Sequence, residues 1–276
     1  MKLKDIYGSD KKIISFEVFP PKLDFEPLLK ELAVLNRFNP AFISLTCGAS
    51  GKENKSFDLI RKISGIGYKV MPHFTCISSS KETIEEELKI LENMGIENLL
   101  ALRGDLPQNN ISNCRDFNYA NELVEFIKKR TDFSLAVAGY PEGHIESLDF
   151  KTDLDNLKRK VEAGADAIFT QLFFNNSMFY KFVQSVREVG ISVPIVAGIM
   201  PIINTKQILK MTSLAKISIP KAVLNAMESY DSLEEFGIEY ASLQCEDLIK
   251  NGFNNLHFYT LNKSYSTMKI LENMRL

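Results

Sequence analysis

The chain has 276 residues, of which 45% are hydrophobic and 25% charged, and its 33 Lys and Arg nearly balance its 35 Asp and Glu. This composition is typical of one large globular domain, and the near-zero net charge argues against nucleic acid or an anionic membrane surface as a partner. No apolar run reaches the roughly 18 residues of a membrane span. Residues 1–10 are polar and charged, unlike a signal peptide, so we expect a cytoplasmic location.

The spacing of cysteines and histidines indicates neither a disulfide framework nor a metal site. No two of the four cysteines form a CxxC pair, and scattered cysteines in a chain of this length are typical of reduced thiols. No two of the three histidines have the spacing of metal ligands on one helix. We therefore expect no metal.

Short apolar runs alternate along the chain with amphipathic stretches. The expected strands are residues 13–19, 41–47, 69–77, 98–103, 134–140, 167–171, 193–199 and 256–260. Helical periodicity marks residues 83–93 and 150–162, and residues 216–251 leave room for extra helices before the last strand. The pattern predicts an α/β fold: an eight-stranded parallel β/α (TIM) barrel in a single domain. An open doubly wound sheet is the main alternative, but its glycine fingerprint is missing after the first strand.

Polar side chains end most of the expected strands. In chain order they are Glu17, Thr46, His73 with Thr75, Arg103, Tyr140 with His144, Gln171, and Tyr259 followed by Asn262 and Lys263. A single polar residue of this kind is more typical of a strand-end cap. Because seven strands end this way, and because a β/α barrel places its active site at this rim, the pattern indicates a functional site.

Glu17 differs from the others because it lies in an apolar strand, between Phe16 and Val18. A buried carboxylate is costly, so its pKa is expected to be raised unless a cation pairs with it. Two interpretations stay open at this point. Glu17 is either a general acid that keeps its proton near neutral pH, or one half of a structural ion pair, with Arg103 as the candidate cation.

Arg103-Gly104-Asp105 follows the fourth strand. The planar fork of Arg103 suits phosphate or carboxylate, and Gly104 lets a ligand approach the backbone. A tight turn with an internal Arg103–Asp105 pair explains the same residues. His144 suits a loop contact or a cofactor partner, and His257, inside a strand, is more typical of packing.

The helix expected after the fifth strand carries a group of three polar residues. Asn156, Arg159 and Lys160 fit a phosphate or pyrophosphate clamp, with Asp153 one turn earlier holding a ribose hydroxyl. A solvated basic helix face explains them equally simply.

Taken together, these motifs resemble those of the bacterial methylenetetrahydrofolate reductase family along nearly the whole chain. The matching segments are SFEVFPP (15–21), PHFTCI (72–77), ALRGDLP (101–107), AGYPE (138–142), NLKRK (156–160), TQLFF (170–174), GIMP (198–201) and HFYTLN (257–262). Because many motifs occur in order, most of them at an expected strand end, the resemblance is specific.

The resemblance implies a function and a set of site residues. It implies a flavoprotein that reduces 5,10-methylenetetrahydrofolate to 5-methyltetrahydrofolate with NADH or NADPH, by ping-pong kinetics through non-covalent FAD, in one-carbon metabolism and methionine biosynthesis. Glu17 matches the acid that opens the folate ring, and Asp105 a second catalytic carboxylate beside pterin and flavin. Other implied substrate contacts are Gln171, Gln207 and Lys263. The implied cofactor contacts are Thr46, Ala49, His73, Arg103, Gly104, Asp105, Ala120, Tyr140, His144, Asp153, Asn156, Arg159 and Lys160.

The sequence departs from the family pattern at Cys47, Thr205, Met211 and Lys263, which bears on the electron donor and the folate tail rather than on the reaction class. We expect residues 1–276 to form one catalytic domain without the regulatory domain of eukaryotic relatives, and thus no direct inhibition by S-adenosylmethionine. As an assembly we expect a homo-oligomer, with no nucleic-acid or membrane partner.

Two other functions remain open from the sequence. A proline-dehydrogenase-like flavin barrel would bind an amino-acid carboxylate and would not need a protonated Glu17. A folate- or flavin-binding subunit of a larger complex would fail to use NADH or NADPH alone. The sequence does not distinguish NADH from NADPH.

Overall fold

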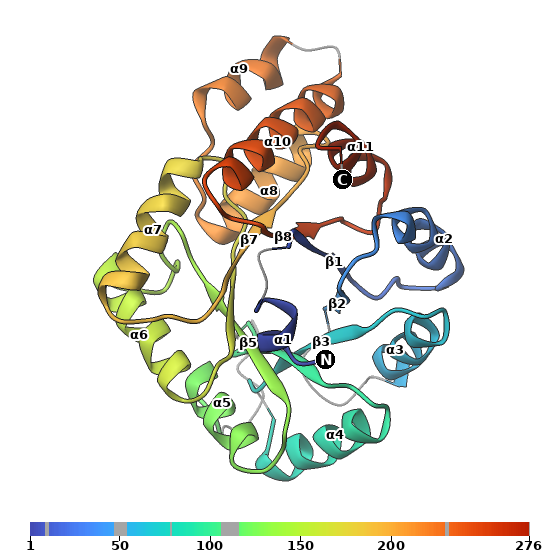
Figure 1. Ribbon diagram of the computed structural model, residues 1–276, viewed down its shortest axis with the longest axis vertical. Helices are drawn as coiled ribbons and strands as arrows, with labels where there is room; N and C mark the ends of the chain where they lie inside the picture. The colour runs from blue at the N-terminus through green and yellow to red at the C-terminus, as the bar shows by residue number, and fades with distance from the viewer. Residues whose placement is uncertain (9–10, 47–53, 78, 106–115, 230–231, 276) are drawn as a thin grey trace.

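A computed structural model describes residues 1–8, 11–46, 54–77, 79–105, 116–229 and 232–275. Within these residues, eight parallel strands pair in chain order and close into a barrel, which confirms the predicted fold (Figure 1). The strands are β1 (Ile13–Val18), β2 (Ile43–Leu45), β3 (Val70–Thr75), β4 (Asn98–Leu102), β5 (Ser134–Gly139), β6 (Ala167–Thr170), β7 (Ile195–Ile199) and β8 (Asn255–Tyr259).

Most strands are shorter than the sequence predicted, and β2 differs most, with three residues against an expected seven. The pairing itself extends further, because Ala41 N donates to Ile14 O at 2.8 Å and Thr46 N to Val18 O at 2.9 Å. These flanking residues make isolated hydrogen bonds rather than a continuous ladder. Apolar runs therefore locate each strand but overestimate its regular length.

Helices surround the barrel in chain order (Figure 1). The ring contains α2 (Glu26–Leu35), α3 (Asn54–Gly65), α4 (Lys81–Asn93), α5 (Ala120–Lys128), α6 (Phe150–Glu162), α7 (Asn176–Glu188), α10 (Leu233–Lys250) and α11 (Tyr265–Asn273). The short 3-10 helix η1 (Asn36–Phe38) follows α2. The predicted helix at 150–162 has the predicted bounds, because Asp149 caps its first turn by accepting from Thr152 N at 2.7 Å.

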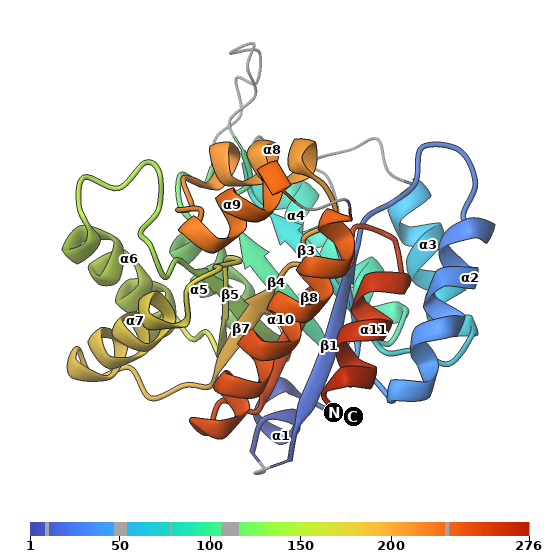
Figure 2. The same ribbon diagram turned by 90° about the horizontal axis from the view of Figure 1, so that it is seen from above.

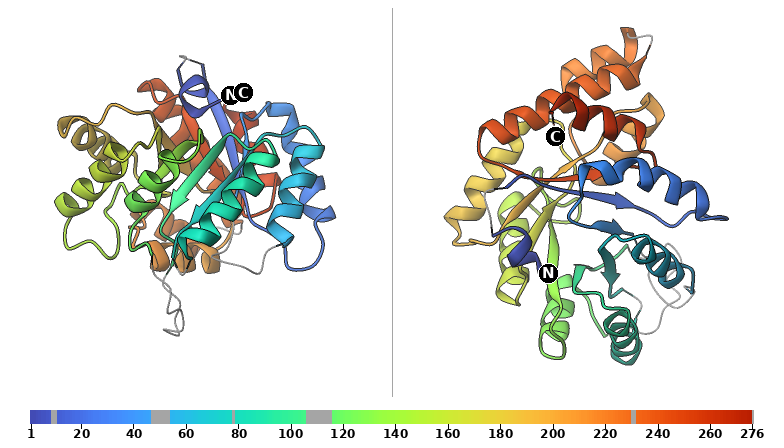
Figure 3. Two further views of the ribbon diagram at one scale, coloured as in Figure 1. Left: turned by 90° about the horizontal axis from the view of Figure 1, so that it is seen from below. Right: turned by 45° about the vertical axis from the view of Figure 1, so that its right-hand side comes forward.

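The two ends of the barrel are built differently. At the amino-terminal end of the strands, α1 (Leu3–Ile6) packs Leu3 and Ile6 with interior residues such as Phe42 and Phe169. At the opposite end lie α8 (Thr205–Ala215) and α9 (Lys221–Ser229), and α9 with α10 forms the helices predicted between strands seven and eight (Figures 2 and 3). No helix among the described residues is long and apolar enough to cross a membrane.

Candidate active site

Inside the barrel, toward the carboxyl-terminal ends of the strands, the side chains beside β1, β2, β3 and β8 are polar. Side chains alternate along a strand, so Ser15 and Glu17 of β1 share one face, while Phe16 and Val18 belong to the apolar layer beneath the helices. In register, Glu17 pairs with Ser44 of β2 and with Tyr259 of β8. Branched aliphatic residues usually fill this space. The substitution of polar groups marks it as a site.

Glu17 lies between two histidines. Its Oε2 is 3.4 Å from His73 Nε2 and 3.6 Å from His257 Nε2, and Thr46 Oγ1 donates to its Oε1 at 3.4 Å. Each histidine is buried and has a serine partner. Ser44 Oγ lies 2.8 Å from His73 Nε2, and Ser15 Oγ lies 2.8 Å from His257 Nδ1.

The electrostatics of Glu17 correct two expectations. Burial raises the pKa of the Glu17 carboxyl, but the electrostatic effect of the nearby His73 and His257 imidazoles outweighs burial and lowers it to about 2. Burial also lowers the pKa of His257, against the opposing effect of Glu17. A raised pKa was expected only if no cation paired with Glu17, and the two imidazoles take the place of that cation. Arg103 is not the partner, and His257 contributes more than packing.

Tyr259 and Thr170 form the wall on the β6–β8 side. The Tyr259 hydroxyl donates to Thr170 O at 2.7 Å, and burial raises the tyrosine pKa well above its usual value. The close approach requires a glycine on β7, since a Cβ at Gly198 would lie 2.3 Å from Thr170 O and 2.8 Å from the Tyr259 ring.

Arg103, after β4, is held by a residue that the sequence analysis did not identify. Its guanidinium forms a two-pronged ion pair with Glu146 of the β5–α6 loop, with Nη2 2.9 Å from Oε1 and Nη1 2.5 Å from Oε2. Neither the Arg103–Glu17 nor the Arg103–Asp105 pair is formed. Gly104 has φ +88°, and a Cβ there would lie 2.8 Å from Ile77, so backbone geometry explains this glycine.

A second polar group forms around α6. Lys160 Nζ donates to Ala138 O at 2.6 Å and lies 5.7 Å from the centre of the Tyr140 ring. The Tyr140 and His144 rings meet in a T-shaped arrangement, with 4.6 Å between their centres. Asp153 is buried and accepts from Ser147 Oγ at 3.1 Å. Burial lowers the pKa of Lys160 to about 8, partly offset by Asp153, and burial raises the pKa of Asp153.

Asn156 and Arg159 also lie on α6 but are exposed. Three residues apart, they share a helix face, and Asn156 is four residues before Lys160. Neither side chain has a hydrogen-bond partner within the described part of the chain. Lys158 differs, because it lies 4.0 Å from Glu162 in a surface pair.

The other predicted residues differ in the contacts that their side chains make. Gln171 Oε1 accepts from Leu172 N at 2.9 Å, and Gln207 spans its own loop by accepting from Ile203 N and donating to Pro201 O. Asp105 and Lys263 are exposed. Ala120 and Thr205 begin α5 and α8, and Met211 packs against the apolar cluster around α8. Ala49 and Cys47 lie outside the described residues.

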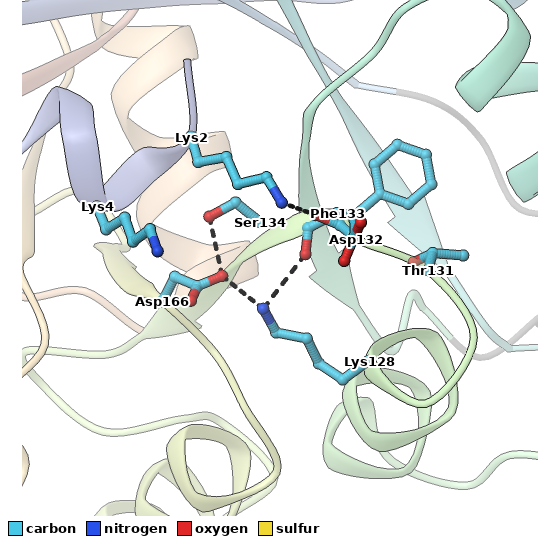
Figure 4. A pocket seen from close by; sticks show the side chains of 8 residues that line it. All are labelled: Lys2, Lys4, Lys128, Thr131, Asp132, Phe133, Ser134 and Asp166. Atoms are coloured by element: carbon cyan, nitrogen blue, oxygen red, sulfur yellow. Dashed lines mark hydrogen bonds and ion pairs between the residues drawn. The ribbon is translucent and has the colours of Figure 1, made fainter.

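The opposite end of the barrel carries a small hollow lined by Lys2, Lys4 and Lys128 (Figure 4). Lys128 Nζ donates to Asp166 Oδ2 at 2.8 Å and to Phe133 O at 3.2 Å, and Lys2 Nζ donates to Asp132 O at 2.6 Å. These contacts fasten α1 and α5 to strand ends. At this end of a β/α barrel, such contacts serve stability.

Sequence comparisons identify one family to which the chain is similar over nearly its whole length. The methylenetetrahydrofolate reductase family model matches residues 2–275. A 5,10-methylenetetrahydrofolate reductase of Buchnera aphidicola (subsp. Baizongia pistaciae) is 38% identical, covering 96% of this chain and 92% of the relative. The Escherichia coli K12 enzyme of that name is 34% identical, covering 91% and 86%. Methylenetetrahydrofolate reductase (NADH) 1 of Arabidopsis thaliana is 36% identical, and the chain spans about half the length of such plant relatives.

A structural comparison supports the fold alone. An uncharacterized Clostridium thermocellum protein, described as binding two copies of 5-methyl-5,6,7,8-tetrahydrofolic acid, superposes with a TM-score of 0.69. The alignment covers 99% of this chain and 98% of that one, at 11% sequence identity.

Proposed function

Because the chain belongs to the methylenetetrahydrofolate reductase family, we propose that it reduces 5,10-methylenetetrahydrofolate to 5-methyltetrahydrofolate. NADH or NADPH is the donor, and FAD is the non-covalent cofactor. The observation that carries the proposal is Glu17, a carboxylate between two imidazoles at the rim where β/α barrels perform chemistry.

The residues around α6 fit a dinucleotide cofactor. Asn156 and Arg159 offer an amide and a guanidinium on one exposed helix face, and Lys160 is an ammonium group whose charge is disfavoured by its burial. A pyrophosphate supplies an anionic partner for all three. Asp153 then holds a ribose hydroxyl. Bound FAD supplies hydride transfer between donor and folate, so that the two substrates are used in turn.

The folate needs a proton before it can accept hydride. Protonation of N10 lets the bond from N10 to the methylene carbon break, and that carbon, now an iminium with N5, accepts the hydride. Glu17 is the group that delivers the proton, and the Nε2 atoms of His73 and His257 lie 3.4 and 3.6 Å from its Oε2. About a fifth of the Glu17 side chain is still exposed, so ligands that cover it shift its pKa upward.

Other rim residues bind and orient the substrate. Gln171 and Asp105 follow β6 and β4, on the far side of the barrel mouth from Glu17, and we assign them to the pterin. A carboxylate at Asp105 also stabilises the iminium charge. We assign the remainder of the folate to Gln207 and to the exposed Lys263.

The test is direct. Purified protein, reconstituted with FAD, is given NADH or NADPH and 5,10-methylenetetrahydrofolate without oxygen, and the product is identified by mass. The proposal requires 5-methyltetrahydrofolate. Flavin that is reoxidised by proline-derived products but not by the folate would favour the proline-dehydrogenase-like reaction. Flavin that neither nucleotide reduces would favour a subunit that depends on a partner.

A further inference from the structure

The loop after β8 has an unfavourable backbone. Leu261 and Asn262 are consecutive non-glycine residues in the left-handed region, with φ of 54° and 60°. This region disfavours residues that have a Cβ, asparagine least among them. Two such residues in sequence persist only where surrounding contacts hold them, and such strain is concentrated at functional sites.

Thr260 and Asn262 of this loop bond to the end of β1 and to Phe19 just beyond it, while Ser264 bonds to Glu31 of α2. Asn262 Oδ1 accepts from Phe19 N at 2.9 Å, and its Nδ2 donates to Phe19 O at 2.7 Å. The side-chain amide thus bonds to the Phe19 backbone as a neighbouring strand would. Two residues earlier, buried Thr260 donates from both Oγ1 (2.7 Å) and N (3.3 Å) to Glu17 O. Asn262 N donates to Thr260 Oγ1 at 3.2 Å and links the two contacts.

These bonds lie where regular strand pairing stops. The β1–β8 register ends at Glu17 and Tyr259, and the β1–β2 register ends at Val18 and Leu45. The next residues of the chain are Pro20 and Pro21, which have no backbone N–H to donate. On the β8 side, therefore, Thr260 and Asn262 alone among the described residues fix the backbone that follows the Glu17 side chain.

We propose that Thr260 and Asn262 are positioning residues for Glu17: they extend the strand pairing beyond β1 and hold its carboxylate in reach of both the imidazoles and the substrate. The inference rests on the proposed function. A general acid must lie within hydrogen-bonding distance of the atom that it protonates, and a displacement of about 1 Å costs about a hundredfold in rate. The strained loop therefore acts on proton transfer, not on cofactor binding.

The test compares Asn262→Gly with Asn39→Gly. Both asparagines have a left-handed backbone, but Asn39 is exposed after η1 and its side chain forms no hydrogen bond with β1 in the described part of the chain. Glycine accepts this conformation, so both variants should melt near the parent. In Asn262→Gly alone, we expect the folate step, in which the reduced flavin is reoxidised by methylenetetrahydrofolate, to slow by about ten- to a hundredfold with an altered pH profile. Flavin reduction by NADH should change by less than about twofold in either variant.

Each outcome decides the matter. A folate step of parental rate and pH profile in Asn262→Gly, or equal slowing of both half-reactions, overturns the positioning role. If Asn262→Gly does not fold, Thr260→Val removes the hydroxyl bond to Glu17 O with little change of shape, and the same split is required of it. A parent protein that binds FAD and oxidises NADH but never reduces the folate overturns the proposed function instead, and the inference with it.

Discussion

Glu17 is ionised in the folded protein because two imidazoles outweigh the cost of its burial. A lowered carboxyl pKa stabilises the fold above the unfolded-state value, and that stabilisation is lost as pH falls toward the folded-state value of about 2. We therefore expect the parent to be more stable than Glu17→Gln at pH 6. Below about pH 4.5 the difference should shrink by roughly 1.4 kcal/mol per pH unit. Urea unfolding of both proteins from pH 6 to 3 measures it, and a constant difference would contradict the assigned pKa.

Lys160 and Lys158 provide a matched pair for the cofactor site. Lys160 is half-buried beside Ala138 and Tyr140, whereas Lys158 pairs with Glu162 on the outer face of α6. Lys160→Ala should weaken FAD binding by about 2 kcal/mol, or roughly thirtyfold, because a charge-assisted bond is lost. Lys158→Ala should leave FAD binding within about twofold of the parent. Flavin fluorescence titration gives both constants, and equal values would refute the clamp.

At the scale of elements, the β5–α6 loop engages Arg103 through Glu146. The resemblance assigns Arg103 to the cofactor, so Glu146 competes with the cofactor's anionic groups for the same guanidinium. Glu146→Gln should tighten FAD binding by about two- to fivefold, because an ion pair exposed to this degree is worth at most about 1 kcal/mol.

The control for this variant is Glu125→Gln, which removes the exposed partner of Lys129 on α5. Its FAD affinity should equal that of the parent. Weaker FAD binding by Glu146→Gln would show that the Arg103–Glu146 pair shapes the binding loop rather than blocking it.

Sequence patterns located every strand and the rim that carries Glu17. They did not identify Ser15 and Ser44, the serines that bond to His257 and His73. The signal for Ser15 was present, since it is two residues before Glu17 and shares its face of the strand. Ser44 has the same relation to Thr46. Glu146 had no such signal, because its pairing with Arg103 joins two loops that are 43 residues apart. The partners of Glu17 were not predicted, because the sequence does not show that His73 and His257 lie beside it.

At the scale of the whole molecule, the barrel separates stability from chemistry. Its amino-terminal end is closed by α1 and by contacts such as Lys128–Asp166. Its carboxyl-terminal end collects the titratable side chains of Glu17, His73 and His257. The order of strands was predictable because each βα unit is local in sequence. The hydrogen bonds from Thr260 and Asn262 to the backbone of Glu17 and Phe19 were not predictable, because they join residues 243 positions apart.

The central claim is that Glu17 delivers the proton that lets methylenetetrahydrofolate accept hydride. Glu17→Gln keeps the size of the side chain and removes the acid, and FAD binding with a melting temperature above the assay temperature confirms that the variant is folded. Stopped-flow absorbance of the flavin then follows each half-reaction without oxygen. We predict near-parental flavin reduction by NADH and a folate step slower by about 10²–10⁴-fold. Equal slowing of both half-reactions, or an unchanged folate step, would contradict the claim.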